Sequence, residues 1–221
     1  MVALDDVAPI LKGIPHMRVP QGRAIYNHVI ENGLERILEL GCAHGVSACY
    51  LGAAVSELGQ GHVTTIDFAR ASTLEPSIFD LLERTGLGEY VTPLLSEFSY
   101  TWQLKSLLAQ SDSYDFIFID AGHTWDTTGF GFFLADRLLD EDGWILFDDL
   151  NWSFERSPSL RDTEAVQAMP VELRRAKQVS EVFDVLVATD PRYETLRDGN
   201  WGWAHKLPTR KRISRIRRTN R

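Results

Sequence analysis

Short apolar segments alternate with amphipathic helical segments along most of the chain, and this alternation constrains the fold more than any other feature. The apolar segments are residues 36–40, 62–66, 90–95, 114–119 and 143–147, and the helical segments between them are residues 46–58, 76–85, 101–110 and 125–139. Repeated strand-helix units place successive strands parallel, with helices covering both faces of the sheet. The sequence therefore predicts an α/β fold around a mostly parallel sheet.

The pattern changes after residue 149. Residues 161–177 are predicted to be helical, and residues 182–187 and 201–204 are predicted to form two strands joined by the turn Asp198-Gly199-Asn200. The expected result is a doubly wound, Rossmann-like sheet of about seven strands whose last hairpin is antiparallel. We expect an N-terminal helical cap or lid over residues 1–34, with its best helix at 21–30, a main domain over 35–206, and a disordered basic tail over 207–221.

Composition and charge narrow the class of protein. The 221 residues are 44% hydrophobic, and no apolar run approaches the roughly 20 residues that span a bilayer. Acids near the N-terminus are atypical of a secretory signal, so we expect a cytoplasmic protein that binds no membrane. The net charge is −8, yet residues 206–221 hold 8 of the 23 basic residues and no acid. The rest of the chain is acidic, which disfavours binding of nucleic acid. The basic tail could still tether an anionic partner.

A glycine turn follows the first predicted strand. Glu39-x-Gly41-x-x-x-Gly45 lies between a strand and a helix, where Gly41 permits a tight turn and helix N–H groups point toward a ligand. Ala43 occupies the second glycine position of a dinucleotide fingerprint, which disfavours a pyrophosphate. Glu39 would also repel a phosphate, but it could accept a hydrogen bond from an ammonium group. Asp67, which ends the second strand, is placed to bind two ribose hydroxyls.

Three acids follow the fourth and fifth predicted strands. Asp120 ends one strand, and Asp148 and Asp149 end the next. Since the carboxyl ends of parallel strands meet at one edge, these carboxylates should converge, and they would repel one another without a cation. The pattern indicates a divalent cation that prefers oxygen ligands, Mg²⁺ before Mn²⁺ or Ca²⁺. The simpler alternative is that each acid caps the next helix.

The glycine turn and the acid after the second strand resemble the class I S-adenosylmethionine-dependent methyltransferases. Residues 37–45 resemble the first motif of that family and residues 65–67 the second, and the similarity runs from about residue 21 to residue 149. The resemblance implies S-adenosyl-L-methionine as cofactor, with Gly41 and Gly45 against its methionine part and Asp67 on its ribose. The full set of cofactor-binding residues that we predict is Glu39, Gly41, Ala43, Gly45, Ser47, Asp67 and Asp120.

The acids also resemble the metal site of the catechol-type O-methyltransferases, with Asp120, Asp148 and Asp149 at the ligand positions. His123 stands where those enzymes carry a lysine base. An imidazole can take a hydroxyl proton near neutral pH, so we predict His123 and Asp120 as catalytic residues. Alternatively, His123 only caps the following helix or orients a ligand.

Three features resemble the branch of the O-methyltransferases that methylates sugar hydroxyls. They are the histidine in place of the lysine base, the Phe147-Asp148-Asp149 ending of the fifth strand, and the helical preface. We therefore expect methyl transfer to a metal-bound hydroxyl of a small molecule or saccharide, with a sugar as the preferred acceptor. The chain could form a homodimer. Trp125 and Trp152 could offer a stacking face to the acceptor, or serve as core residues. Three alternatives remain: a phenol or catechol acceptor, a nicotinamide-dependent oxidoreductase, and a non-catalytic cofactor-binding module whose basic tail binds RNA or another anion.

Overall fold

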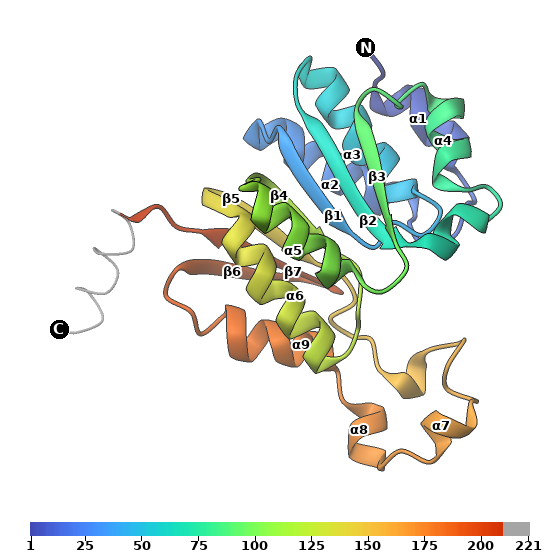
Figure 1. Cartoon of the computed structure of the whole chain (residues 1–221), viewed down its shortest axis with the longest axis vertical. Helices are drawn as coiled ribbons and strands as arrows, with labels where there is room; N and C mark the ends of the chain where they lie inside the picture. Colours follow the sequence, from blue (N-terminus) through green and yellow to red (C-terminus); the bar gives the residue numbers. More distant parts are fainter. Residues whose placement is uncertain (210–221) are drawn as a thin grey trace.

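A seven-stranded sheet forms the centre of the protein in this computed structural model, which describes residues 1–209 (Figure 1). The strand order is β3-β2-β1-β4-β5-β7-β6. The strands are β1 Arg36–Leu40, β2 His62–Phe68, β3 Val91–Ser96, β4 Tyr114–Ile119, β5 Leu139–Phe147, β6 Tyr193–Asp198 and β7 Trp201–Lys206. The first five strands are parallel, and β7 pairs antiparallel with β5 and β6. The predicted α/β fold with a closing antiparallel hairpin is confirmed.

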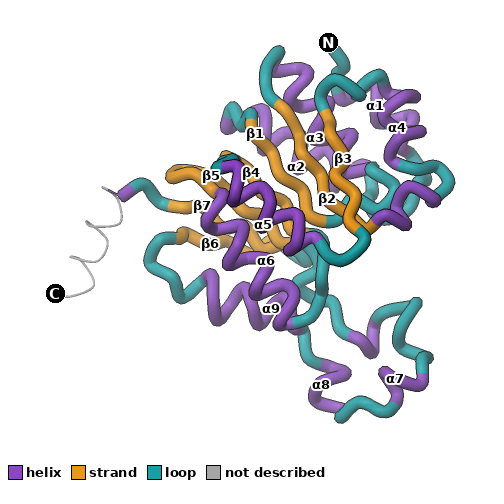
Figure 2. Tube along the Cα trace, in the orientation of Figure 1, coloured by secondary structure: helices purple, strands orange, loops and turns teal. Residues whose placement is uncertain are grey.

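Helices cover both faces of the sheet (Figure 2). One layer contains α1 Leu4–Leu11, α2 Val19–Asn32, α3 Val46–Leu58 and α4 Ile78–Thr85, and the other contains α5 Tyr100–Gln110, α6 Trp125–Leu138 and α9 Gln178–Val182. Strand side chains alternate between the two hydrophobic cores: Ile37 and Phe116 face the first, Leu38 and Ile117 the second. This alternation follows from the pleat of a β-strand.

The prediction of a strand at residues 182–187 is wrong. These residues continue α9 as a π-helical turn, Phe183–Val187, and the outer strand of the hairpin is β6. Val182, Phe183 and Val187 are buried while Val185 is 54% exposed, which is the spacing of a helix face that packs on α6. The β-branched composition of residues 182–187 suggested a strand. The true outer strand, β6, gave no such signal, because it lies at the sheet edge, buries only Tyr193 and carries no apolar pattern.

The prediction of one helix over residues 161–177 is only partly correct. Two short helices form instead, α7 Glu164–Gln167 and α8 Val171–Arg175, and Pro170 separates them as the residue before α8. The segment of residues 150–177, which we call the arm, also contains the short 3₁₀ helix η2 Phe154–Arg156 and projects from the rest of the protein (Figure 1).

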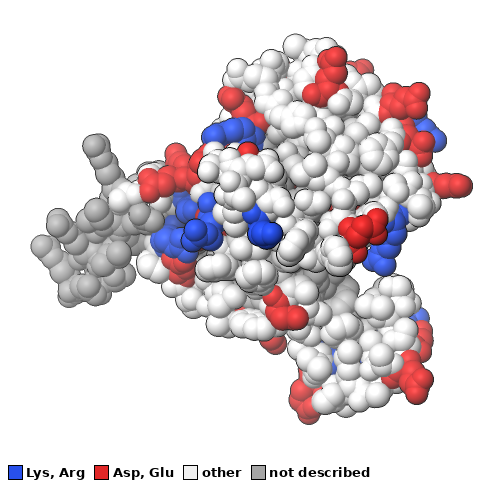
Figure 3. Space-filling model, in the orientation of Figure 1, with Lys and Arg blue, Asp and Glu red and all other residues white. Residues whose placement is uncertain are grey.

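Acidic and basic side chains are interspersed over the face shown in Figure 3. Among the described residues, no helix has the length and apolarity needed to cross a bilayer.

The helical preface of residues 1–34 folds as α1 and α2, the second of which is the predicted helix at 21–30 with two added residues at each end. His28 of α2 lies in an aromatic cluster, with ring centroids 5.6 Å from Phe116, 4.8 Å from Trp144 and 4.4 Å from Trp203. Burial lowers the pKa of His28 from 6.5 to about 4. The preface is thus tied to the sheet through a neutral histidine.

Acid should weaken this contact. The unfolded chain takes up a proton at His28 below its pKa of 6.5, whereas the folded chain does so only near pH 4, so stability is lost as the pH falls through this window. Between pH 7 and pH 5 the free energy of unfolding should fall about 2 kcal/mol further in wild type than in His28→Phe. Urea titrations at both pH values measure this difference. His62→Gln, at an exposed histidine, should follow wild type.

Candidate active site

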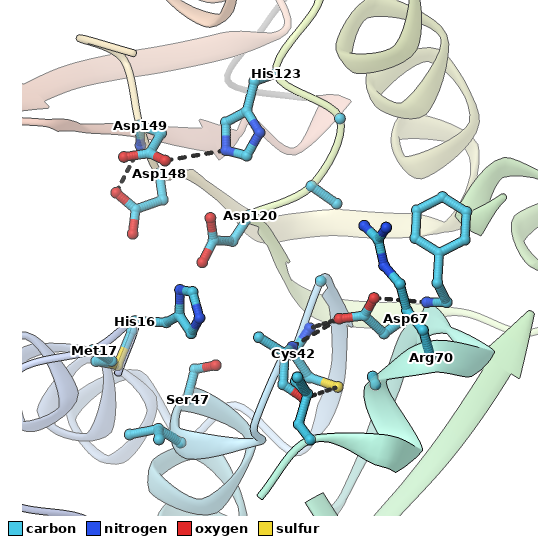
Figure 4. A pocket seen from close by; sticks show the side chains of 18 of the residues that line it. His16, Met17, Cys42, Ser47, Asp67, Arg70, Asp120, His123, Asp148 and Asp149 are labelled. Atoms are coloured by element: carbon cyan, nitrogen blue, oxygen red, sulfur yellow. Dashed lines mark hydrogen bonds and ion pairs between the residues drawn. The ribbon is translucent and has the colours of Figure 1, made fainter. Parts of the chain in front are cut away.

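A pocket of about 660 Å³ opens at the carboxyl ends of the parallel strands (Figure 4). The strand ends are aligned by hydrogen bonds that continue the sheet, from Gly41 N to Ile66 O at 2.8 Å and from Asp120 N to Leu40 O at 2.8 Å. A third bond of this kind joins Asp148 N to Ile119 O at 3.0 Å. Of the predicted site residues, the lining includes Gly41, Ala43, Ser47, Asp67, Asp120, His123, Asp148 and Asp149. Glu39 and Gly45 do not line it.

The glycine turn requires glycine at two positions. Gly41 has a φ of +93°, and a Cβ there would lie 2.3 Å from the backbone oxygen of Asp120. Gly45, at the start of α3, has a φ of +91°, and a Cβ would lie 2.6 Å from Cγ1 of Ile78. Gly41 therefore permits the close approach of β1 to the β4 end, and Gly45 the packing of the turn on α4.

Replacing Gly41 with alanine should unfold this corner of the pocket. The strained φ and the overlap with a backbone atom together should cost about 3 kcal/mol of stability, and binding of S-adenosylhomocysteine should be lost. Thermal denaturation and calorimetric titration test both effects. Gly88→Ala is the matched control, because Gly88 has no neighbouring atom within 4 Å of an added Cβ. Nucleoside binding by Gly41→Ala at wild-type affinity would contradict the expected role of the turn.

Asp67 holds the glycine turn in place. Its Oδ2 accepts hydrogen bonds from Cys42 N at 2.9 Å and Ala43 N at 2.7 Å, and its Oδ1 accepts one from Phe68 N at 2.6 Å. Oδ1 accepts only this one bond and has further acceptor capacity. The acid predicted to bind ribose therefore also shapes the turn, which the sequence did not indicate.

Glu39 lies fully buried behind the turn. Thr65 Oγ1 donates to its Oε2 at 2.5 Å, while Oε1 is buried without a hydrogen-bond partner among the described residues. Burial raises the pKa of Glu39 to about 7, opposed by the nearby hydroxyls of Ser47 and Thr65. A buried carboxylate oxygen without a partner is costly, and a cationic group would favour its ionised form.

The structure brings together Asp120, His123 and Asp149, whose donor atoms all lie within 4.8 Å of one another. Asp148 lines the same pocket, but it is not a member of this set. Its Oδ1 accepts from Asp149 N at 2.6 Å, and its side chain is 7% exposed. The predicted ligand trio thus divides into two acids that converge with His123 and a third that supports the loop.

The three aspartates that follow β4 and β5 shift one another's pKa values. Burial and the charges of Asp148 and Asp149 raise the pKa of Asp120 well above its usual value. Burial and the charge of Asp149 also raise the pKa of Asp148. Burial alone would raise the pKa of Asp149, but hydrogen bonds from His123 and Asn200 lower it. Asp149 is therefore the acid of the three whose ionised form its surroundings favour most.

His123 is held from two sides. Its Nε2 lies 3.0 Å from Asp149 Oδ2, and its ring stacks on Trp152 with centroids 5.0 Å apart. Since an ionised carboxylate only accepts, Nε2 is the donor of this bond, and within residues 1–209 Nδ1 has no recorded hydrogen bond. Trp152 thus stacks on His123 within the protein. Trp125, at the start of α6, is 41% exposed and does not line the pocket.

Several lining residues come from segments that carried no functional signal in the sequence. His16, Met17 and Gln21 come from the α1–α2 connection and the first turns of α2, and His16 points into the pocket from a backbone φ of +82° (Figure 4). Ser159 comes from the arm, and Asn200 from the turn between β6 and β7. The segment after β2, η1 Ala69–Thr73, adds further lining. No motif marks these positions, and only the fold brings them to the pocket.

This sheet order, with a ligand pocket at the glycine turn, is that of a class I methyltransferase. Residues 38–150, just over half of the chain, match the methyltransferase-domain family, and the chain belongs to that family. A comparison with curated protein sequences gave no match.

Solved structures with this fold include O-methyltransferases. The O-methyltransferase from Bacillus cereus, in complex with SAH, is 20% identical, with 92% of this chain and 90% of that chain covered and a TM-score of 0.66. TomG from Streptomyces achromogenes, an O-methyltransferase involved in tomaymycin synthesis and solved with SAM, is 19% identical, with 93% and 89% covered and a TM-score of 0.67. A protein from Staphylococcus aureus, provisionally named a caffeoyl-CoA O-methyltransferase, is 21% identical, with 92% and 90% covered and a TM-score of 0.66. At these identities the likeness establishes the shared fold.

Proposed function

We propose that the protein is an S-adenosylmethionine-dependent O-methyltransferase that acts on a hydroxyl of a small molecule or saccharide. The preferred acceptor is a sugar, and the metal cofactor is Mg²⁺ or Mn²⁺. The observation that carries the proposal is the position of Asp120, which lies in one pocket with both the glycine turn and the His123–Asp149 pair. Methyl transfer to oxygen needs a methyl donor beside a hydroxyl and a group that takes the proton. Both requirements can be met at this edge of the sheet.

The cofactor half of the pocket suits a nucleoside with an amino-acid group. S-adenosylmethionine would supply a methyl group on a positively charged sulfur. Glu39 lies buried behind the glycine turn and does not line the pocket, so its unpartnered carboxylate would favour an ammonium group there through its charge. The turn residue Ala43 leaves no second glycine for a pyrophosphate. Gly41, Ser47 and Asp67 line the adjacent wall, where the Asp67 carboxylate would accept hydrogen bonds from the ribose hydroxyls. These contacts disfavour a nicotinamide dinucleotide.

The acidic half of the pocket suits a hard divalent cation. Asp120 and Asp149 supply carboxylate oxygens, and within residues 1–209 neither has an ion pair with lysine or arginine. Such a cation, when bound, lowers the pKa of a neighbouring hydroxyl and offsets the repulsion between the acids. Asp149 holds the imidazole through Nε2, and His123 takes the hydroxyl proton on Nδ1. S-adenosylmethionine held beside Gly41 and Asp67 would supply the methyl group to a hydroxyl held beside Asp120 and His123, and its sulfur would leave as a neutral thioether.

The acceptor side of the pocket is polar. Gln21 and Ser159 line it together with His16, and these groups can hydrogen-bond several hydroxyls at once. Trp152 is stacked on His123 and is therefore not free to cover a flat phenol. These features support a sugar over a catechol as acceptor.

Calorimetry followed by a transfer assay tests the proposal. S-adenosylhomocysteine and then Mn²⁺ should each give a binding signal, and radiolabelled methyl should pass to a member of a sugar panel. EDTA should stop the transfer and Mg²⁺ should restore it. Nucleoside binding without a cation signal would remove the metal from the mechanism. Methylation of catechols alone would replace the sugar as acceptor, and failure to bind the nucleoside would overturn the proposal.

A further inference from the structure

Asn200 contacts the acidic loop after β5 through every polar group of its side chain. It lies at the turn of the C-terminal hairpin, and its Nδ2 donates to Asp149 Oδ1 at 2.8 Å. Its Oδ1 accepts from Asn151 N at 2.8 Å, and its backbone oxygen accepts from Leu150 N at 2.9 Å. Nδ2 also donates a longer bond to Asp148 Oδ1 at 3.4 Å, so one residue holds four consecutive residues of the loop.

The loop needs such support because Asp149 has a φ of +60°. A residue other than glycine in the left-handed region costs about 1 kcal/mol, and it persists where its surroundings impose it. The bonds from Asn200 hold the Asp149 carboxylate and the backbone of the next two residues, and the bond from Trp152 N to Asp149 O at 2.9 Å closes the turn that they form. Several hydrogen bonds thus hold the unfavourable backbone conformation of Asp149.

The same contacts fix the direction of the Asp149 carboxylate. Oδ1 is held by Asn200, and Oδ2 faces His123 Nε2 at 3.0 Å (Figure 4). With both oxygens engaged, the carboxylate cannot turn away from Asp120 and His123 without losing a hydrogen bond. Partners of this kind, which orient a ligand without touching the ion, are worth about 10- to 100-fold in metal affinity.

We propose that Asn200 is a positioning residue that aims Asp149 at the cation and at His123. This inference rests on the proposed function, because it assigns Asn200 a role in the cation site of that reaction. It makes the C-terminal hairpin part of the active site, although the hairpin lies outside the segment of residues 38–150 that matches the family.

Mn²⁺ binding, followed by electron paramagnetic resonance of the free ion, tests the role of Asn200 without an activity assay. Asn200→Ala and Asn200→Ser should bind Mn²⁺ about 10- to 100-fold more weakly than wild type, with S-adenosylhomocysteine affinity unchanged within about two-fold. The serine variant keeps a polar side chain that is too short to reach both partners, and it serves if the alanine variant does not fold. Asn151→Ala is the matched control, because it removes a half-buried amide of the same loop, which bonds to Lys177 and Gly199, and keeps the backbone N–H that Asn200 Oδ1 accepts.

The outcomes separate this inference from the proposed function. Wild-type Mn²⁺ affinity in a folded Asn200 variant would overturn the positioning role while leaving the methyltransferase in place. A parallel loss of Mn²⁺ affinity, nucleoside affinity and melting temperature would also overturn it, because that is the signature of a merely structural residue. Failure of the wild-type protein itself to bind Mn²⁺ would overturn the cation site, and the role of Asn200 with it.

Discussion

Replacing Asp120 with asparagine should lower methyl transfer roughly a thousand-fold, because several kcal/mol of transition-state stabilisation would disappear with one ligand charge. Asparagine preserves the shape of the side chain and the backbone oxygen that packs against Gly41. Binding of S-adenosylhomocysteine should therefore persist while Mn²⁺ affinity falls. Initial rates at saturating cofactor, together with the two titrations, measure these effects. Turnover within a few-fold of wild type would show that the acids have no catalytic role.

Two further variants make the Asp120 result specific. Asp162→Asn removes a carboxylate that is 79% exposed on the arm, and it should change nothing. Asp148→Asn should weaken Mn²⁺ binding less than Asp120→Asn, because Asp148 accepts a hydrogen bond from the loop backbone and lies outside the converging set. The opposite order would return Asp148 to the ligand position that the family resemblance gives it.

The sequence predicts the parallel core of this fold well because its signals there are local. Each buried strand is a short apolar run, so the five parallel strands lie within a few residues of their expected bounds. Pro93, which weakened the signal of the third strand, is tolerated because β3 is at the sheet edge. The failure at residues 182–187 arose where composition and burial pattern disagree, since Val185 is β-branched and exposed.

The candidate site is predictable only in part, for a related reason. Asp67 lies near the end of β2, and Asp120 and Asp149 follow β4 and β5, so the topology of a parallel sheet alone places them at one edge. Asn200 and His16 reach the pocket from a hairpin turn and a helix connection, and their positions depend on tertiary packing that no spacing in the sequence records. The difference between Asp148 and Asp149 depends on one backbone conformation, the φ of +60° at Asp149.

Replacing His123 with glutamine should lower the catalytic rate constant about 10²- to 10⁴-fold, the usual contribution of a positioned general base. The glutamine amide can still donate to Asp149, so the acidic loop should keep its conformation, while the atom that takes the proton is lost. Single-turnover rates at saturating cofactor and acceptor measure the loss. His62→Gln, an exposed histidine at the start of β2, is the matched control and should retain wild-type rates.

Mn²⁺ affinity then decides between the two roles open to His123, whose donor atoms lie within reach of the same ion as Asp120 and Asp149. Asp149 holds His123 through Nε2, and Trp152 stacks on its ring. This is the arrangement of a base that is oriented by an acid, with Nδ1 as the nitrogen that takes the proton. We therefore expect His123→Gln to keep Mn²⁺ affinity within a few-fold while the rate falls. A joint loss of rate and Mn²⁺ affinity would make His123 a ligand, and a water or an acceptor group would then have to take the proton.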